Sequence, residues 1–230
     1  MQQFFDFPIT PSFGFDSFIT CAGNASALGL ARRVADPNDP EKLIYLHGPS
    51  GCGKTHLLSS IAGTGFPCIT LRDTFTPDLI MSTFSNCNGM AIDDLHLMPP
   101  CHELRRALWQ LFNEFHTSGR IIAMSGLIPP RDLDNLDEHL TSRLLWGFVV
   151  RLDTTDDESR SMILKKVADD RQIILPGEVI DYLLATASRD AGDLIKSFQK
   201  LYSSSMTQKR RITVQLAREI RVAESLEEST

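Results

Sequence analysis

The chain has 230 residues, 42% of them hydrophobic, and a formal net charge of −6. This length allows one domain, or a domain with a small companion. The acidic balance excludes bulk electrostatic attraction to a phosphate backbone, so direct nucleic-acid binding is expected to be weak or absent.

The sequence favours a cytoplasmic protein. No apolar run approaches the ~18 residues that span a bilayer, so membrane insertion is not expected. The amino terminus carries Asp6 and lacks the positively charged region of a signal peptide. The five cysteines form no C-x-x-C pair, which argues against a disulfide framework and a zinc site.

Short apolar runs before residue 153 are typical of buried strands. They are LIYLH (43–47), PCITL (67–71), GMAID (89–93), RIIAM (120–124) and FVVRL (148–152). Between the third and fourth runs, one helical face collects Leu104, Leu108, Leu111, Phe112 and Phe115. Strands that alternate with helices predict an α/β fold, with a parallel five-stranded sheet covered by helices on both faces.

The pattern changes near residue 154, where a capping threonine and three acidic residues indicate the start of a helix. Helices are predicted at about 156–170, 177–187, 190–203 and 213–224, with a loop at the serines 203–205. We therefore expect an α/β domain at 15–154, a small all-helical domain at 155–226 and a tail at 227–230.

The first predicted strand runs into GPSGCGKT (48–55), which a helical pattern follows. This spacing and context fit a P-loop, in which glycines let backbone N–H groups surround a phosphate at a helix start. Lys54 is expected to reach the β- and γ-phosphates, and Thr55 to bind Mg²⁺. The predicted nucleotide contacts are Gly48, Pro49, Ser50, Gly51, Cys52, Gly53, Lys54, Thr55 and His56.

The third predicted strand ends in Asp93 and Asp94, at the edge of the sheet where the P-loop also lies. Asp93 is predicted to hold Mg²⁺, largely through water. Asp94 is predicted to polarise an attacking water, and the alternative is that it only fixes a neighbouring loop.

Several segments resemble the DnaA branch of the AAA+ ATPases. They are FDSFITCAGNASAL (15–28), AIDDLHL (91–97), SGLIPPRDL (125–133) and LTSRLLWGFVVRL (140–152). LPGEVIDYLLATASRD (175–190) and RRITVQLAREI (210–220) resemble the helical lid of that branch. The resemblance implies an AAA+ fold that binds ADP or ATP with Mg²⁺, and nucleotide contacts from Gly23 and Asn24 in a linker near the adenine.

The same resemblance assigns Arg143 to the catalytic apparatus. The matching arginine of the family acts on nucleotide held by the adjoining subunit, and the alternative for Arg143 is a structural salt bridge. Ser125 matches a residue that senses the γ-phosphate, but the acidic residue that follows it in the family is replaced by Gly126. The arginine that the family carries in its lid is likewise replaced by glycine, at Gly192. These departures imply a slow ATPase that binds ADP at least as well as ATP.

The chain ends at Thr230, without room for the helix-turn-helix domain of DnaA, and so resembles the Hda-like regulators that inactivate DnaA. Such proteins begin with a peptide that binds the β subunit of the DNA polymerase sliding clamp. Residues 1–14 are the corresponding peptide and linker here, and Gln2, Phe5 and Phe7 fit the binding pattern. The expected partners are therefore the sliding clamp and DnaA, with a homo-oligomer possible.

Two other functions remain open at this stage. One is a self-assembling DnaA-type ATPase that hydrolyses its own ATP. The other is a non-hydrolysing adaptor or loader that recruits another replication protein and uses nucleotide only to stay folded.

Overall fold

The computed structural model describes residues 13–63, 65–71 and 75–227. By its internal contacts the chain divides into an α/β unit, Phe13–Thr154, and a helical unit that begins at Thr155. The two units are considered separately below.

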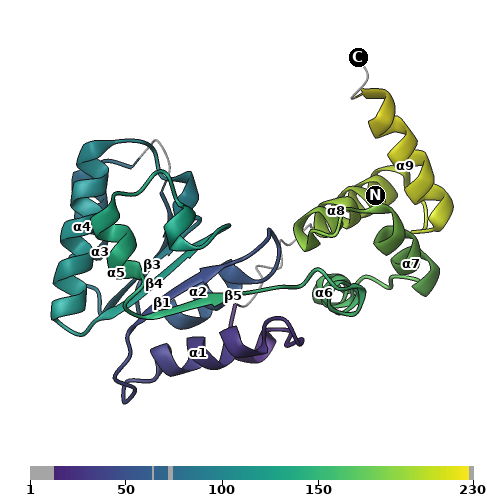
Figure 1. Cartoon of the computed structure of the whole chain (residues 1–230). Coiled ribbons are helices and arrows are strands. Elements are labelled where there is room, and N and C mark those ends of the chain that lie inside the picture. The colour runs from purple at the N-terminus through teal and green to yellow at the C-terminus, as the bar shows by residue number, and fades with distance from the viewer. Residues whose placement is uncertain (1–12, 64, 72–74, 228–230) are drawn as a thin grey trace, which may run out of the picture. The chain divides into compact units, whose positions relative to one another are not determined.

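The α/β unit is built on one parallel sheet (Figure 1). Its strands are β1 (Leu43–His47), β2 (Cys68–Thr70), β3 (Gly89–Asp93), β4 (Ile121–Gly126) and β5 (Phe148–Arg151). They lie in the order β2-β3-β4-β1-β5, and every neighbouring pair is parallel. The register pairs His47 with Gly126 and Thr70 with Asp93, so the carboxyl ends of the central strands meet at one edge.

Five α-helices accompany this sheet in the described part of the unit. They are α1 (Ala25–Ala35), α2 (Lys54–Ala62), α3 (Pro77–Phe84), α4 (His102–Thr117) and α5 (Glu138–Leu144). Short 3-10 turns lie at η1 (Phe15–Ser17), η2 (Leu95–Leu97) and η3 (Pro130–Asp132). Two of the helices begin at a side-chain cap, because Thr76 accepts from the Leu79 N–H and Asp137 accepts from the Leu140 N–H.

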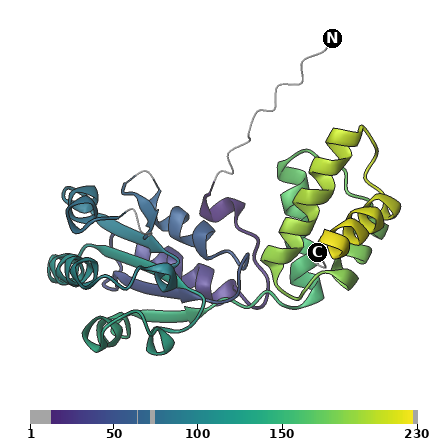
Figure 2. The same cartoon turned by 90° about the horizontal axis from the view of Figure 1, so that it is seen from above.

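The two faces of the sheet carry separate cores. Ile44 and Leu46 pack with residues of α1 and α2, whereas Tyr45 packs with α3, α4 and α5. Figure 2 shows the sheet between these two groups of helices. Because successive residues of a strand point to opposite faces and both faces are covered, β1 and β3 are apolar along most of their length.

The helical unit consists, in its described residues, of four helices. They are α6 (Asp157–Asp170), α7 (Gly177–Thr186), α8 (Ala191–Gln208) and α9 (Val214–Glu227). Leu164, Phe198 and Leu216 belong to its core. A buried arginine also joins two helices, because Arg160 of α6 donates to the carbonyl oxygens of Leu184 and Ser188.

The predicted fold class is confirmed, since the sheet is parallel and five-stranded and four helices follow it in the described residues. The predicted loop at 203–205 is wrong, because α8 continues to Gln208. The hydroxyl of Thr207 donates to the Ser203 carbonyl, and Ser205 is buried, so these polar residues are accommodated within the helix.

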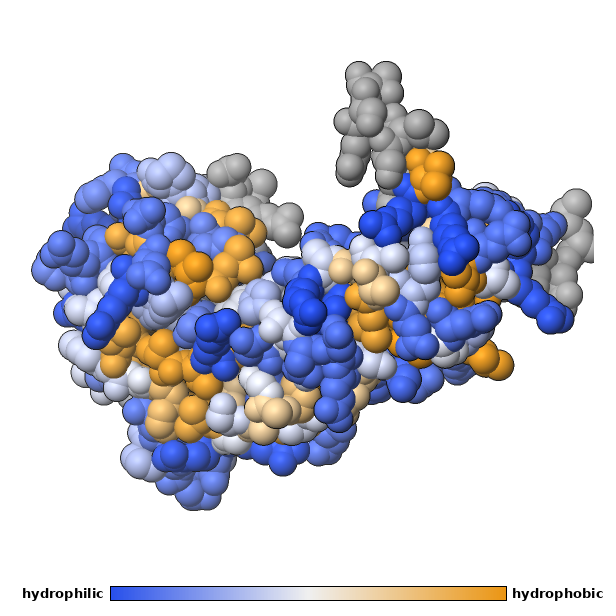
Figure 3. All heavy atoms as spheres, turned by 45° about the vertical axis from the view of Figure 1, so that its right-hand side comes forward, coloured by the Kyte–Doolittle hydropathy of each residue, from blue (hydrophilic) through white to orange (hydrophobic). Residues whose placement is uncertain are grey.

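The surface is mostly hydrophilic, with hydrophobic side chains gathered in patches (Figure 3). Within the described ranges, no helix combines the length and apolar character needed to cross a bilayer. Two tryptophans of the α/β unit stay exposed, Trp109 at 38% and Trp146 at 57%. Large exposed aromatic side chains are frequent where proteins bind one another.

Candidate functional site

The loop between β1 and α2 depends on glycine. Gly48, Gly51 and Gly53 have φ angles of 150°, 71° and 104°, in a region that other residues rarely adopt. A Cβ atom on Gly48 would overlap the carbonyl oxygen of Leu152, and one on Gly53 would lie 2.7 Å from the Phe18 ring. The turn is thus tight and closely packed, as a phosphate-binding loop requires.

Lys54 is the first residue of α2, and its side chain is buried. Its Nζ donates to the carbonyl oxygens of Gly48 and Pro49 at 2.8 and 2.9 Å. The cation therefore lies against the loop itself, and phosphate oxygens bound by the loop would compete for its donors.

Three segments meet at the Asp93 carboxylate. Thr55 donates from Oγ1 to Oδ2 of Asp93 at 2.5 Å, and Ser125 donates from Oγ to Oδ1. The Asp94 N–H then donates to the Ser125 Oγ at 3.1 Å. A hydroxyl beside a buried carboxylate supplies the oxygen ligands that Mg²⁺ prefers, so Thr55 and Asp93 fit the metal role.

Asp94 lies in the left-handed region, with φ 50° and ψ 49°. This conformation is uncommon for a residue with a side chain and is often found at functional sites. Burial, with a contribution from the Asp94 charge, raises the pKa of Tyr45, whose hydroxyl donates to the Ile128 carbonyl at 3.0 Å. His96 Nδ1 lies 4.0 Å from Asp94 Oδ1.

His47 is a residue of this edge that the sequence analysis missed. It ends β1 directly before Gly48, and its ring stacks on that of Tyr45 with centroids 6.4 Å apart. Burial lowers the pKa of His47, and the charges of Arg151 and Lys54 lower it further. The sequence could have indicated His47 as a site residue, because it directly precedes Gly48, the first glycine of the P-loop.

Gly126, at the end of β4, stands where relatives of the DnaA branch are expected to carry an acidic residue. A Cβ atom at this position would overlap the Tyr45 hydroxyl oxygen. Tyr45 thus occupies the space that a side chain at position 126 would need, so a larger residue there would require the Tyr45 ring to move. The absence of an acidic side chain at position 126 and the presence of the Tyr45 hydroxyl in the same space are therefore linked by packing.

The predicted adenine contacts, Gly23 and Asn24, are held in the linker before α1. The buried Asn24 side chain accepts from the Cys21 N–H at 2.8 Å and donates to the Ile19 carbonyl at 3.0 Å. The Gly23 carbonyl accepts from the Asp153 N–H at 2.9 Å. These bonds fix the backbone of the linker before α1.

His56 follows Thr55 in α2, and its ring faces the linker. Its Nε2 lies 2.9 Å from the Gly14 carbonyl oxygen and 3.2 Å from the Ser17 hydroxyl. The ring also packs edge-on against Phe13 and Phe18, with centroids 5.2 Å apart in both pairs. The structure thus places His56 as an anchor of the linker on α2.

Arg143 lies near the end of α5 and makes no bond to the P-loop or to Asp93 in the described residues. Its Nε donates to Asn113 Oδ1 at 2.9 Å, and Nη1 donates to the His139 carbonyl at 3.1 Å. Its acceptors therefore include no carboxylate among the described residues.

The predicted clamp-binding residues Gln2, Phe5 and Phe7 lie outside the described part of the chain.

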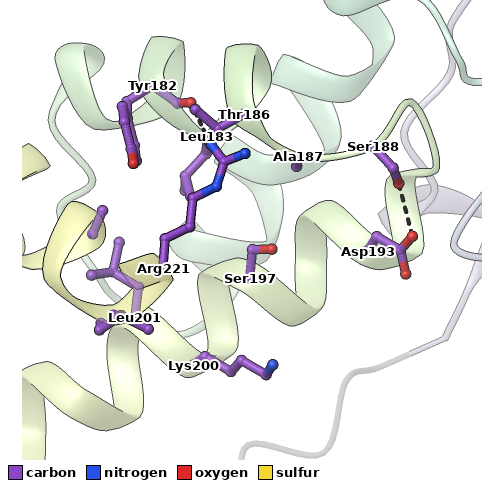
Figure 4. Close-up of a pocket in the computed structure, with 12 residues that line it drawn as sticks. Tyr182, Leu183, Thr186, Ala187, Ser188, Asp193, Ser197, Lys200, Leu201 and Arg221 are labelled. Atoms are coloured by element: carbon purple, nitrogen blue, oxygen red, sulfur yellow. Dashed lines mark hydrogen bonds between the residues drawn. The ribbon is translucent and has the colours of Figure 1, made fainter. Parts of the chain in front are cut away.

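The helical unit has a pocket of about 230 Å³ between α7, α8 and α9. Figure 4 shows Arg221 extending from α9 toward Thr186 of α7, and Ser188 bonded to Asp193. No residue predicted as a site residue lines this pocket. Gly192, next to Asp193, lies at the start of α8, where its N–H donates to the capping carboxylate of Asp190 at 2.7 Å.

A parallel sheet with a glycine turn, a buried lysine and a hydroxyl–carboxylate pair at its edge defines a P-loop protein of the AAA+ class. The chain belongs to the family of the bacterial DnaA ATPase domain, whose model matches residues 9–66 and 71–151. A second model, for the lid domain of Hda, matches residues 157–220.

Chromosomal replication initiator proteins DnaA are similar in sequence. That of Chloroflexus aurantiacus is 28% identical over 228 residues, which are 91% of this chain and 48% of the relative. That of Clavibacter sepedonicus is 27% identical over 208 residues, or 82% of this chain and 44% of the relative. The chain thus spans about half the length of the curated relatives it matches.

Solved structures agree on the fold. Domain III of the Thermotoga maritima replication initiation protein DnaA matches with a TM-score of 0.78 at 25% identity, over 92% of this chain and 96% of that one. AMPPCP-bound DnaA from Aquifex aeolicus matches with a TM-score of 0.69 at 20% identity, over 85% of this chain and 67% of that one.

Replacement of Gly48 tests the packing of the loop. Gly48→Ala is expected to abolish ADP and ATP binding in calorimetric titration and to lower the free energy of unfolding by at least about 2 kcal/mol, because the new methyl group meets a backbone carbonyl. Gly119→Ala is the control, since Gly119 has φ 65° in open space. It should cost about 1–2 kcal/mol and leave binding intact. Unchanged nucleotide affinity in Gly48→Ala would refute the assignment of the loop.

The lowered pKa of His47 predicts an acid-sensitive stability. The folded protein binds a proton at this ring less readily than the unfolded chain, so the stabilisation is present above the unfolded pKa of about 6.5. It is lost as the pH falls from there through the folded pKa. Urea unfolding between pH 7 and 5 should show this fall, and His47→Gln should make it shallower. An identical pH slope in the variant would contradict the prediction.

Proposed function

We propose that the chain is an Hda-like regulator of DNA replication initiation. It holds an adenine nucleotide at Gly48–Thr55, binds the sliding clamp through Gln2, Phe5 and Phe7, and stimulates hydrolysis of DnaA-bound ATP by presenting Arg143. The match of residues 157–220 to the lid domain of Hda supports this function. Arg143 carries the proposal, because its acceptors among the described residues are an amide and a carbonyl and no carboxylate neutralises it.

The resident nucleotide is proposed to be ADP or ATP with Mg²⁺. Lys54 would bind the phosphates, Thr55 and Asp93 would hold the metal, and the metal would neutralise phosphate charge. Gly126 provides no acidic group, and Gly192 replaces the lid arginine that the family resemblance leads us to expect. The site therefore discriminates little between ATP and ADP, and its own turnover is slow.

The reaction that Arg143 assists occurs on the partner. A water oxygen forms a bond to the γ-phosphorus, the bond to the β–γ bridging oxygen breaks, and the electron pair leaves with ADP while the water proton passes to solution. Arg143 exchanges no atom in this step. Its guanidinium donates hydrogen bonds to the oxygens on which negative charge develops, which lowers the barrier.

The first test is hydrolysis of ATP on DnaA in the presence of this protein and DNA-loaded clamp. Arg143→Ala is expected to lower the stimulated rate by about 10³-fold or more, to the unstimulated level, because an arginine supplied in trans contributes that much. Its affinity for ADP should not change, since Arg143 does not contact the P-loop.

Arg106→Ala is the matched control, because Arg106 is an exposed arginine of α4 and the same charge is lost. Full stimulation by Arg143→Ala would instead favour the adaptor or loader function. Fast basal hydrolysis that rises with protein concentration would favour the self-assembling ATPase.

The second test is binding to the purified sliding clamp. Replacement of Gln2, Phe5 and Phe7 by alanine is expected to weaken binding by at least ~30-fold, since each anchor of a short peptide contributes a large share of the affinity. Phe4→Ala is the control, because Phe4 lies in the same segment but outside the pattern. Surface plasmon resonance with immobilised clamp measures both, and equal affinities for all forms would remove the clamp from the proposal.

A further inference from the structure

Four residues contact Arg143, and together we call them the Arg143 cradle: the side chains of Trp109, Asn113 and Trp146 and the backbone carbonyl of His139. The guanidinium carbon lies 5.4 Å from the centroid of Trp109 and 5.3 Å from that of Trp146. Asn113 and the His139 carbonyl accept from two of its nitrogens. Two aromatic rings and two acceptors thus restrict a side chain that on an open surface would sample many rotamers.

The orientation of Asn113 is fixed in turn. Its Nδ2 donates to the carbonyl of Trp109, one helical turn earlier in α4, at 2.9 Å. The amide group therefore turns its oxygen toward Arg143, where Oδ1 accepts from Nε. Asn113 therefore orients Arg143 through one hydrogen bond, and its own orientation is fixed by a second hydrogen bond within α4.

Trp146 is supported from the core. Its ring packs edge-on against His116, with centroids 5.1 Å apart. His116 stacks on Phe112, a fully buried residue of α4, with centroids 5.9 Å apart. A continuous row of rings therefore connects the exposed face of the cradle with the packed interior, which keeps Trp146 in place although it is 57% exposed.

The hydrogen bonds leave a defined set of donors on Arg143. A guanidinium has five N–H donors, and among the described residues one on Nε and one on Nη1 have acceptors. The donors without an acceptor belong to the terminal nitrogens Nη1 and Nη2. These two terminal nitrogens are the part of the guanidinium that can bind two oxygens of a phosphate.

We propose that Trp109, Asn113 and Trp146 are positioning residues that hold Arg143 ready to donate from its terminal nitrogens to phosphate oxygens of a nucleotide on a second subunit. This inference rests on the proposed function. The cradle lowers the ordering cost of docking, because the arginine is restricted before the partner arrives. The two tryptophans also supply the exposed aromatic surface that a docked partner would cover.

The cradle predicts a separation of rate from binding. With DnaA-bound ATP as substrate, Asn113→Ala is expected to lower the plateau rate of stimulated hydrolysis by about 10–100-fold, the effect of a small displacement of a catalytic group. The concentration that gives half of the plateau should change by less than about twofold, because Asn113 is not itself proposed to touch the partner. Trp146→Phe should keep most of the plateau rate, whereas Trp146→Ala should not.

Intrinsic fluorescence gives a second readout, because the two tryptophans of the chain are the two in the cradle. Addition of ATP-loaded DnaA should change the emission of the wild type. Asn113→Ala should show a different emission before addition, since Arg143 then no longer lies fixed between the rings. Gln110→Ala, which removes an exposed amide of α4, is the control and should behave as the wild type in both assays.

The outcomes separate this inference from the function on which it rests. If Arg143→Ala abolishes stimulation but Asn113→Ala matches the wild type in plateau rate and emission, the positioning role is wrong and the proposed function stands. If Arg143→Ala stimulates fully, the proposed function fails and the inference fails with it. A lower plateau in Asn113→Ala with an unchanged half-saturating concentration and wild-type behaviour of Gln110→Ala supports the inference.

Discussion

The site depends on one carboxylate that joins three elements. Asp93 ends β3 and accepts from Thr55 at the start of α2 and from Ser125 in β4. Because the carboxylate is buried, loss of either donor would leave part of it unsatisfied in a poorly polar environment. The same carboxylate that would hold the metal therefore also joins the P-loop helix to the central strands. Both the local structure and the binding of the metal depend on Asp93.

Much of the fold could be predicted because a parallel sheet with helices on both faces leaves continuous apolar runs in the sequence. The runs at 43–47 and 89–93 coincide with β1 and β3 at both ends. The end of α8 could not be predicted in this way. Its serines have the composition of a loop, and only the packing of Ser205 and the hydroxyl bond of Thr207 show that they belong to a helix.

The residue types of the site were predictable from the P-loop pattern, but their surroundings were not. The lack of space for a side chain at position 126 comes from Tyr45, which lies far away in sequence but on the neighbouring strand of the sheet. Likewise Asn113 belongs to no motif, and the role proposed for it rests on its hydrogen bond to Arg143 of α5. Such effects depend on distances between elements, which neither spacing nor composition encodes.

The anchoring of the linker has a mechanical consequence. The described chain begins at Phe13, whose ring packs on His56, and Gly14 bonds to the same imidazole. His56 is the third residue of α2, the helix that begins with Lys54. Any force transmitted through the residues before Phe13 would therefore reach the fold at the first turn of α2, the helix that directly follows the phosphate loop.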